Sequence, residues 1–173
     1  MKKILINSLF IFVISSIFHF VYNIFPNNIT ALFFPVNESI WEHYKLLYTS
    51  AILFSYLNIA SKSYHLEALL RAVLIIVILS IFYLPIYYLY GENLVITLII
   101  LFISILITEL ILSRVINKNY RLLNIISIPI IISISILFMY LTYNPIHNDL
   151  FLDKTKKTYG LNKWFSCKYI YII

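Results

Sequence analysis

The stretch ILINSLFIFVISSIFHFVYNIF, from Ile4 to Phe25, carries no charged side chain. A bilayer core about 30 Å thick is crossed by about 20 helical residues, so this run is long enough to span it. Lys2 and Lys3 precede the run, and Pro26-Asn27-Asn28 follows it as a turn signal that a helix does not continue through. The stretch therefore predicts a membrane-spanning helix over residues 4–25.

Four further apolar runs follow along the chain. They are too long for β-strands, which rarely exceed about ten residues, and lipid excludes open sheet edges. These runs predict an all-α fold, an integral membrane bundle of about five transmembrane helices. We expect a transmembrane helical domain over residues 1–143 and a polar C-terminal tail over residues 144–173. The expected spans are residues 4–25, 40–60, 66–90, 94–113 and 122–143.

The composition agrees with this fold class and excludes several kinds of site. Charged residues make up 12% of the 173 residues, whereas a soluble domain has about 25%. Two glycines are too few for a nucleotide-phosphate loop, and the single Cys167 excludes an internal disulfide framework or an all-cysteine zinc knuckle. The net charge of +6 lies on a mostly apolar chain, which predicts the lipid bilayer as partner and no nucleic acid. A homo-oligomer and a small-molecule or lipid ligand stay open.

The positions of lysine and arginine predict the orientation of the chain. With Lys2 and Lys3 in the cytoplasm, the outer connections over residues 26–37 and 91–93 carry neither lysine nor arginine. That asymmetry follows the positive-inside rule. The five lysines of the tail oppose it, but charges late in the chain count less than those beside the first span. We expect a multi-pass protein of the cell membrane with a cytoplasmic N-terminus.

The segment PVNESIWEHYK, from Pro35 to Lys45, gathers polar groups at the start of the second span. Glu38 and Glu42 are four residues apart, so a helix would place both on one face together with Lys45. Like charges this close raise the pKa of one carboxylate unless a cation, either Lys45 or a metal ion, lies between them. Candidate catalytic residues are Glu38, Glu42, His43 and Lys45.

A polar stripe on the first span points toward the same end of the bundle. A histidine is costly to expose to lipid, so His19 should face the other helices. The tail adds His147, Asp149 and Asp153 just beyond the fifth span, and an odd number of spans puts these groups at one membrane face. The stripe consists of Ser15, Ser16, His19, Tyr22 and Asn23.

Three motifs carry a resemblance to a known family. They are His19-Phe20-x-Tyr22, then Pro35-Val36-Asn37-Glu38-Ser39-x-Trp41-Glu42-His43-x-Lys45, then Leu150-Phe151-x-Asp153 with Tyr159-Gly160. With these motifs the chain resembles an uncharacterised family of bacterial multi-pass membrane proteins, known by a domain-of-unknown-function label. The resemblance implies an integral membrane protein with five or so helices and brings no activity or cofactor. Candidate ligand-binding residues are His19, Trp41, Asp153 and Tyr159.

Two interpretations of the Glu/His segment stay open. One is helix capping, in which Ser39 and Glu42 form a capping box and the helix dipole favours carboxylates in the first turn. The other is an acid/base pair or a divalent-metal site, since imidazole and carboxylate groups suit zinc. Adjacent Glu42 and His43 point about 100° apart on a helix, so they cannot both bind one ion without another segment. Candidate metal ligands are His19, Glu38, Glu42 and His43.

Three functions are compatible with these features. The first is a membrane protein whose Glu/His cluster, on the extracytoplasmic side, organises the bundle or binds a ligand or partner. The second is a membrane-embedded, metal-dependent hydrolase or transferase that acts on a lipid or envelope substrate. The third is a small permease that uses the cluster as an ion or proton site.

Overall fold

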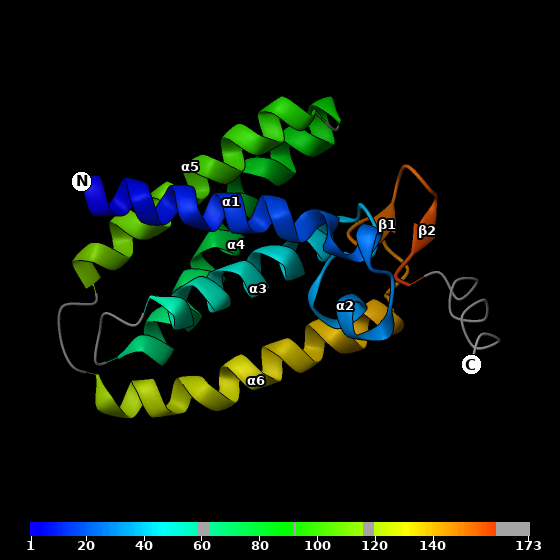
Figure 1. Ribbon diagram of the computed structural model, residues 1–173. Helices are drawn as coiled ribbons and strands as arrows, with labels where there is room; N and C mark the ends of the chain where they lie inside the picture. Colours follow the sequence, from blue (N-terminus) through cyan, green and yellow to red (C-terminus); the bar gives the residue numbers. More distant parts are fainter. Residues whose placement is uncertain (59–62, 92, 116–119, 162–173) are drawn as a thin grey trace. The chain divides into compact units, whose positions relative to one another are not determined.

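A computed structural model describes residues 1–58, 63–91, 93–115 and 120–161 (Figure 1). The described chain is almost entirely helical, which confirms the all-α fold class. Two very short strands near the end of the described chain make up its sheet structure. In chain order the elements are α1 (Lys2–Ile24), α2 (Asn28–Phe33), α3 (Ile40–Leu57), α4 (Tyr64–Tyr90), α5 (Leu94–Val115), α6 (Arg121–Tyr143), β1 (Leu152–Asp153) and β2 (Thr158–Tyr159).

Four helices, α1, α4, α5 and α6, are long and apolar enough to cross a membrane. They correspond to the first, third, fourth and fifth expected spans. The second expected span, residues 40–60, corresponds to α3, and its last two residues lie outside the described chain. Because the first turns of α3 carry Trp41, Glu42, His43 and Lys45, this helix is less apolar than the other four. About five spans is therefore consistent with the structure.

The chain divides into two compact units, which we call unit 1 and unit 2. Unit 1 comprises Met1–Ile17 and Leu47–Ile132, and unit 2 comprises Phe18–Leu46 and Ser133–Ile173, of which residues 162–173 lie outside the described chain. The expected boundary between a domain over residues 1–143 and a tail over residues 144–173 stays a prediction.

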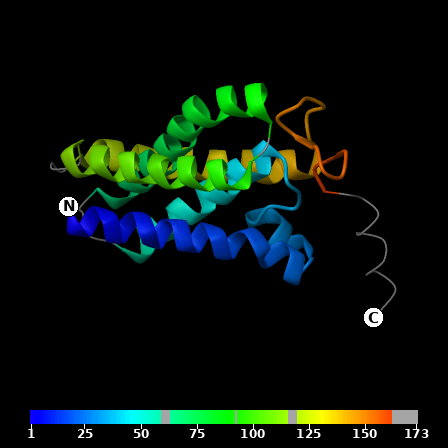
Figure 2. The same cartoon turned by 90° about the horizontal axis from the view of Figure 1, so that it is seen from above.

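Unit 1 is built around the neighbouring helices α4 and α5, which run in opposite directions (Figures 1 and 2). Gly91, with φ +77°, ends α4 in a backbone conformation that L side chains rarely adopt. Ile75 and Ile105 are completely buried, whereas Val77, Ile81 and other apolar side chains on the same two helices are exposed. Helices that are apolar on their outer faces suit a lipid environment.

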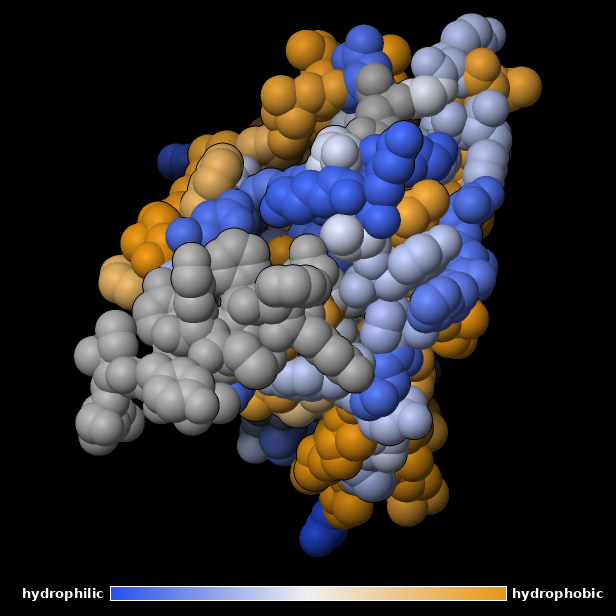
Figure 3. Space-filling view, turned by 90° about the vertical axis from the view of Figure 1, so that its right-hand side faces the viewer, coloured by the Kyte–Doolittle hydropathy of each residue, from blue (hydrophilic) through white to orange (hydrophobic). Residues whose placement is uncertain are grey.

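Unit 2 combines short elements with the ends of longer helices. Asn27 caps α2 by accepting hydrogen bonds from the backbone of Ile29 and Thr30. The strands β1 and β2 form an antiparallel hairpin, and Figure 3 shows hydrophilic residues gathered on the face that carries it. Gly160, with φ +54°, follows the hairpin where an added Cβ would lie 2.5 Å from the Thr142 carbonyl oxygen. The described part of the expected tail is thus folded against the end of α6.

Candidate functional site

Two histidines and one glutamate from three separate segments meet in unit 2. His19 lies in the last turns of α1, Glu38 precedes α3, and His43 lies in the first turn of α3. The Glu38 Oε2 atom lies 3.3 Å from His19 Nε2 and 3.6 Å from His43 Nε2. One ligand atom of each residue lies within 4.8 Å of the other two. We call these three residues the His/Glu trio.

The backbone of α3 orients His43 within the trio. Its Nδ1 atom lies 2.8 Å from the Ser39 carbonyl oxygen, four residues earlier. A carbonyl oxygen only accepts hydrogen bonds, so we assign a ring proton to Nδ1, and the Nε2 atom faces Glu38. Metal-binding histidines are commonly fixed in this way by a hydrogen bond from the other ring nitrogen. His19 lacks such a support, since its buried Nδ1 has no hydrogen-bond partner within the described chain.

The β1–β2 hairpin positions Glu38 through its backbone. Asp153 Oδ2 accepts a hydrogen bond of 3.1 Å from the Glu38 N–H group. The other carboxylate oxygen of Asp153 accepts from the backbone of Thr155 and Lys156 and from the Thr155 hydroxyl. Asp153 is therefore a residue that holds the loop around Glu38, with both of its oxygens already engaged.

The electrostatics of this region favour ionised carboxylates. The hydrogen bond from His19 lowers the pKa of Glu38, and it outweighs the opposing effect of partial burial. Burial alone would raise the pKa of Asp153, but the hydrogen bonds from Thr155, Lys156 and Glu38 together hold that pKa below its ordinary value. An ionised Glu38 beside two imidazoles is a donor set that a divalent cation accepts.

Glu42 does not join the trio. Its carboxylate lies 2.6 Å from the Lys45 ammonium and accepts hydrogen bonds from Thr142 Oγ1 and the Val36 N–H group. Both charged side chains are almost completely buried, with exposed fractions of 1% and 2% for Lys45 and Glu42. The capping box forms only in part, because Ser39 Oγ accepts from the Glu42 N–H group while Ser39 itself donates to Asn37.

The expectation that Glu38 and Glu42 share a helix face is wrong. Helix α3 begins at Ile40, so Glu38 lies in the preceding loop, where helical spacing does not apply. The loop turns Glu38 toward the two histidines, whereas Glu42 on the helix points to Lys45. Lys45 is the cation beside Glu42 alone, and it also donates to the Ala31 carbonyl oxygen and to Thr142.

The two aromatic candidates make ring contacts. Trp41 packs between Phe138 and Phe151, with ring centroids 4.8 Å and 4.7 Å away. Its buried Nε1 atom has no hydrogen-bond partner within the described chain. Tyr159 stacks on His147 with centroids 4.6 Å apart. The Trp41 ring joins the segment after α6 to α3, whereas the Tyr159 contact lies within that segment.

Unit 1 contains a second polar cluster that sequence reasoning missed. Arg71 donates to Glu67, Glu109 and Ser55, and Asn7 donates to the second oxygen of Glu109 at 2.9 Å. Arg71 is buried in α4, and Glu67 lies one turn before it on the same helix. Glu109 within the apolar sequence of α5 was the available signal, because a charged group in a span requires an internal partner.

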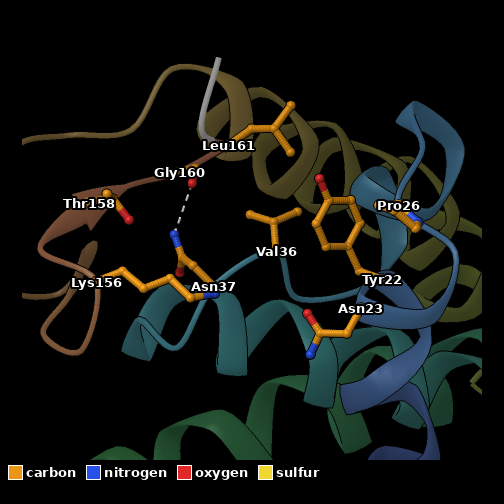
Figure 4. A pocket seen from close by; sticks show the side chains of 9 residues that line it. All are labelled: Tyr22, Asn23, Pro26, Val36, Asn37, Lys156, Thr158, Gly160 and Leu161. Carbon is orange, nitrogen blue, oxygen red and sulfur yellow. Dashed lines mark hydrogen bonds between the residues drawn. The ribbon is translucent and has the colours of Figure 1, made fainter. Parts of the chain in front are cut away.

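A cavity of about 290 Å³ opens in unit 2. Figure 4 shows the hairpin residues on one side of it and residues from the end of α1 on the other. Among the residues that line the cavity, the side-chain amide of Asn37 donates a 3.0 Å hydrogen bond to the Gly160 carbonyl oxygen. Its lining residues are Tyr22, Asn23, Pro26, Val36, Asn37, Lys156, Thr158, Gly160 and Leu161.

Comparison with known proteins identifies a family and no activity. The model of the "Family of unknown function (DUF6512)" matches residues 1–161, which include the trio, the hairpin and the six helices of the described chain. No curated protein and no solved structure matches the chain.

Proposed function

We propose a function for this chain, which belongs to the family of unknown function DUF6512, from the geometry of its own residues. Four of its helices are long and apolar enough to cross a membrane, as in an integral membrane protein. We propose that it is a multi-pass protein of the cell membrane, with a cytoplasmic N-terminus, that binds a divalent transition-metal ion such as zinc. The ligands are His19, Glu38 and His43, on the extracytoplasmic side.

The convergence of the three ligand atoms carries this proposal. Zinc binds imidazole nitrogen at about 2.0–2.1 Å and carboxylate oxygen at about 2.0–2.2 Å in tetrahedral geometry, which puts neighbouring ligand atoms about 3.3–3.5 Å apart. The separations from Glu38 Oε2, 3.3 Å to His19 and 3.6 Å to His43, are close to that spacing, and all three ligand atoms lie within 4.8 Å of one another. The hydrogen bond from His43 to Ser39 further supports a metal-binding tautomer.

A second candidate function is a metal-dependent hydrolase or transferase. The side chains of the trio are 25%, 39% and 33% exposed for His19, Glu38 and His43. Three protein ligands with solvent access leave a fourth position for water or substrate, as catalytic zinc sites require. Glu42 is not the general base in this mechanism, because Lys45, Thr142 and Val36 already engage its carboxylate. His19, Glu38 and His43 would hold the ion, which would supply the chemistry that activates a water molecule for attack on the substrate.

Zinc titration of the purified protein tests the metal site. We expect one ion per chain, and we expect His19→Ala, His43→Ala and Glu38→Gln each to weaken binding at least about tenfold. His147→Ala is the matched control, since His147 is an exposed histidine of the same unit and stacks on Tyr159. Equal zinc affinity in the wild type and the three ligand variants would refute the site and leave the trio as a hydrogen-bonded contact.

A further inference from the structure

The polar groups that line the cavity of unit 2 are those of an anion site, and they come from both of its sides. Lys156 places a cation in its lining, and Tyr22, Asn23 and Thr158 add hydroxyl and amide groups (Figure 4). None of the nine lining residues carries a carboxylate. Within the described chain no side chain is bonded to these four polar side chains, whereas Asn37 is already engaged with Gly160 and Ser39. A lysine with neighbouring hydroxyl and amide donors is a common arrangement for binding phosphate.

The rest of the lining is apolar, and part of the cavity wall lies at the end of a span. Pro26, Val36 and Leu161 supply the apolar lining. Tyr22 and Asn23 belong to the last turn of α1, which ends at Ile24. The end of a membrane-spanning helix lies at the level of the lipid headgroups, where tyrosine is enriched.

Exposed apolar side chains also lie next to this lining in the sequence, with the exposed Asn27 and Asn28 between them. Ile24 is 64% exposed, Phe25 is 62% exposed and Ile29 is 72% exposed. These residues flank Pro26 in the sequence and would be poorly placed in water. An apolar surface beside an anion-binding cavity matches the two parts of a phospholipid, with acyl chains outside and the phosphate inside.

We propose that this cavity binds the phosphate group of a membrane lipid, with Lys156 as the cationic contact. The proposal uses none of the residues of the His/Glu trio and does not depend on a bound metal. It goes beyond the proposed function by assigning a lipid-binding site to unit 2. Free phosphate shares the anionic chemistry, but it would gain nothing from the apolar lining or the adjacent exposed surface.

Calorimetric titration of the full chain in detergent, with a chelator present, tests this site. The probes are a short-chain phosphatidic acid, the diacylglycerol with the same acyl chains, and inorganic phosphate. We expect phosphatidic acid to bind at least about tenfold more tightly than either of the others, since only it offers both the charge and the acyl chains. Equal binding of diacylglycerol would overturn the phosphate contact, and equal binding of inorganic phosphate would overturn the lipid assignment.

Variants at Lys156, with matched controls at Lys157, test whether the phosphate contact lies in the cavity. Lys156→Gln should weaken binding of phosphatidic acid about tenfold, and Lys156→Glu should weaken it further. Lys157→Gln and Lys157→Glu are matched controls, because Lys157 is exposed in the same turn and does not line the cavity. These controls should change the affinity less than about threefold, as expected for an exposed charge without a direct contact. Equal losses in both pairs would show general electrostatic attraction and overturn the site.

Discussion

At the residue scale, the candidate site contains one of two neighbouring glutamates, and these two lie in different environments. Glu38 is partly exposed and faces two imidazoles, whereas Glu42 is buried and paired with Lys45. The sequence identified His19, Glu38 and His43 as candidates because ionisable groups near a span are costly and require partners. It could not separate Glu38 from Glu42, because that depends on where α3 begins.

Breaking the buried ion pair should destabilise the protein strongly. Lys45→Met leaves the Glu42 carboxylate buried without its cation, so we expect a loss of about 3–5 kcal/mol in the free energy of unfolding. The double variant Lys45→Met with Glu42→Gln should recover part of that loss, because it removes both charges. Denaturant unfolding in detergent micelles measures the effect. A single variant as stable as the wild type would contradict the interpretation of this pair.

Asp153 should contribute stability that depends on pH. Its pKa is lowered in the folded protein, so its contribution is present above the unfolded pKa of about 3.9 and is lost as the pH falls through the folded pKa. We expect Asp153→Asn to lower the stability by about 1–3 kcal/mol at neutral pH, since backbone donors lose a charged acceptor.

Thermal unfolding between neutral pH and about pH 3 checks this prediction. The difference between the wild type and Asp153→Asn should shrink toward acid pH, because the wild-type carboxylate then becomes protonated. Asp149→Asn is the control, since Asp149 is an exposed carboxylate before the hairpin. A constant difference at all pH values would contradict an ionised Asp153 as the source of the stability.

At the scale of elements, the long helices were predictable and the short elements were not. Apolar runs of about 20 residues define α1, α4, α5 and α6 without knowledge of their neighbours. Helix α2 and the β1–β2 hairpin are too short to show a periodic pattern in the sequence. They are stabilised by side-chain hydrogen bonds, such as those at the Asn27 cap of α2 and the one from Asn37 to the Gly160 carbonyl oxygen after the hairpin. The position of Asp153 beside Glu38 therefore could not be derived from residue spacing.

The backbone of Gly160 should be essential for the hairpin to pack in unit 2. An alanine Cβ at this position would lie 2.5 Å from the Thr142 carbonyl oxygen, in a conformation with φ +54°. We expect Gly160→Ala to cost about 2 kcal/mol or more of folding free energy, from the positive φ angle and the steric clash together.

Gly91→Ala separates these two contributions. Gly91 also has a positive φ angle, +77°, but an added Cβ would meet nothing within 4 Å. With ψ −166°, Gly91 lies in a region that is essentially restricted to glycine, so this variant should lose only a backbone term of about 1–3 kcal/mol. Chemical unfolding of both variants gives the comparison, and an equal loss of stability would contradict the close packing of Gly160 against Thr142.

At the scale of the whole molecule, the structure is that of a membrane protein whose long helices expose apolar side chains and bury the charged ones inside their apolar sequence. Apolar side chains are widely exposed on α1, α4, α5 and α6, as the long apolar runs of the sequence predict. The charged groups inside the apolar sequence, Arg71 and Glu109, are buried together in unit 1. Their pairing joins residues 38 positions apart, so no local pattern reveals it.

The proposed orientation predicts which residues are accessible from outside the cell. In a Cys167→Ser background, a membrane-impermeant maleimide should label Asp149→Cys in intact cells. Lys3→Cys should react only after the membrane is permeabilised, because the positive-inside rule places Lys2 and Lys3 in the cytoplasm. Both positions are exposed, so burial does not limit the reaction. The reverse labelling pattern would contradict the proposed orientation.

X-ray absorption at the zinc edge of the zinc-loaded protein tests whether the His/Glu trio binds zinc. We expect zinc ligands at about 2.0–2.1 Å that include two imidazoles and at least one oxygen. His147→Ala should leave this spectrum unchanged, and His19→Ala should remove one imidazole from it. A spectrum without imidazole scattering, or one that His19→Ala and His43→Ala both leave unaltered, would contradict the metal site.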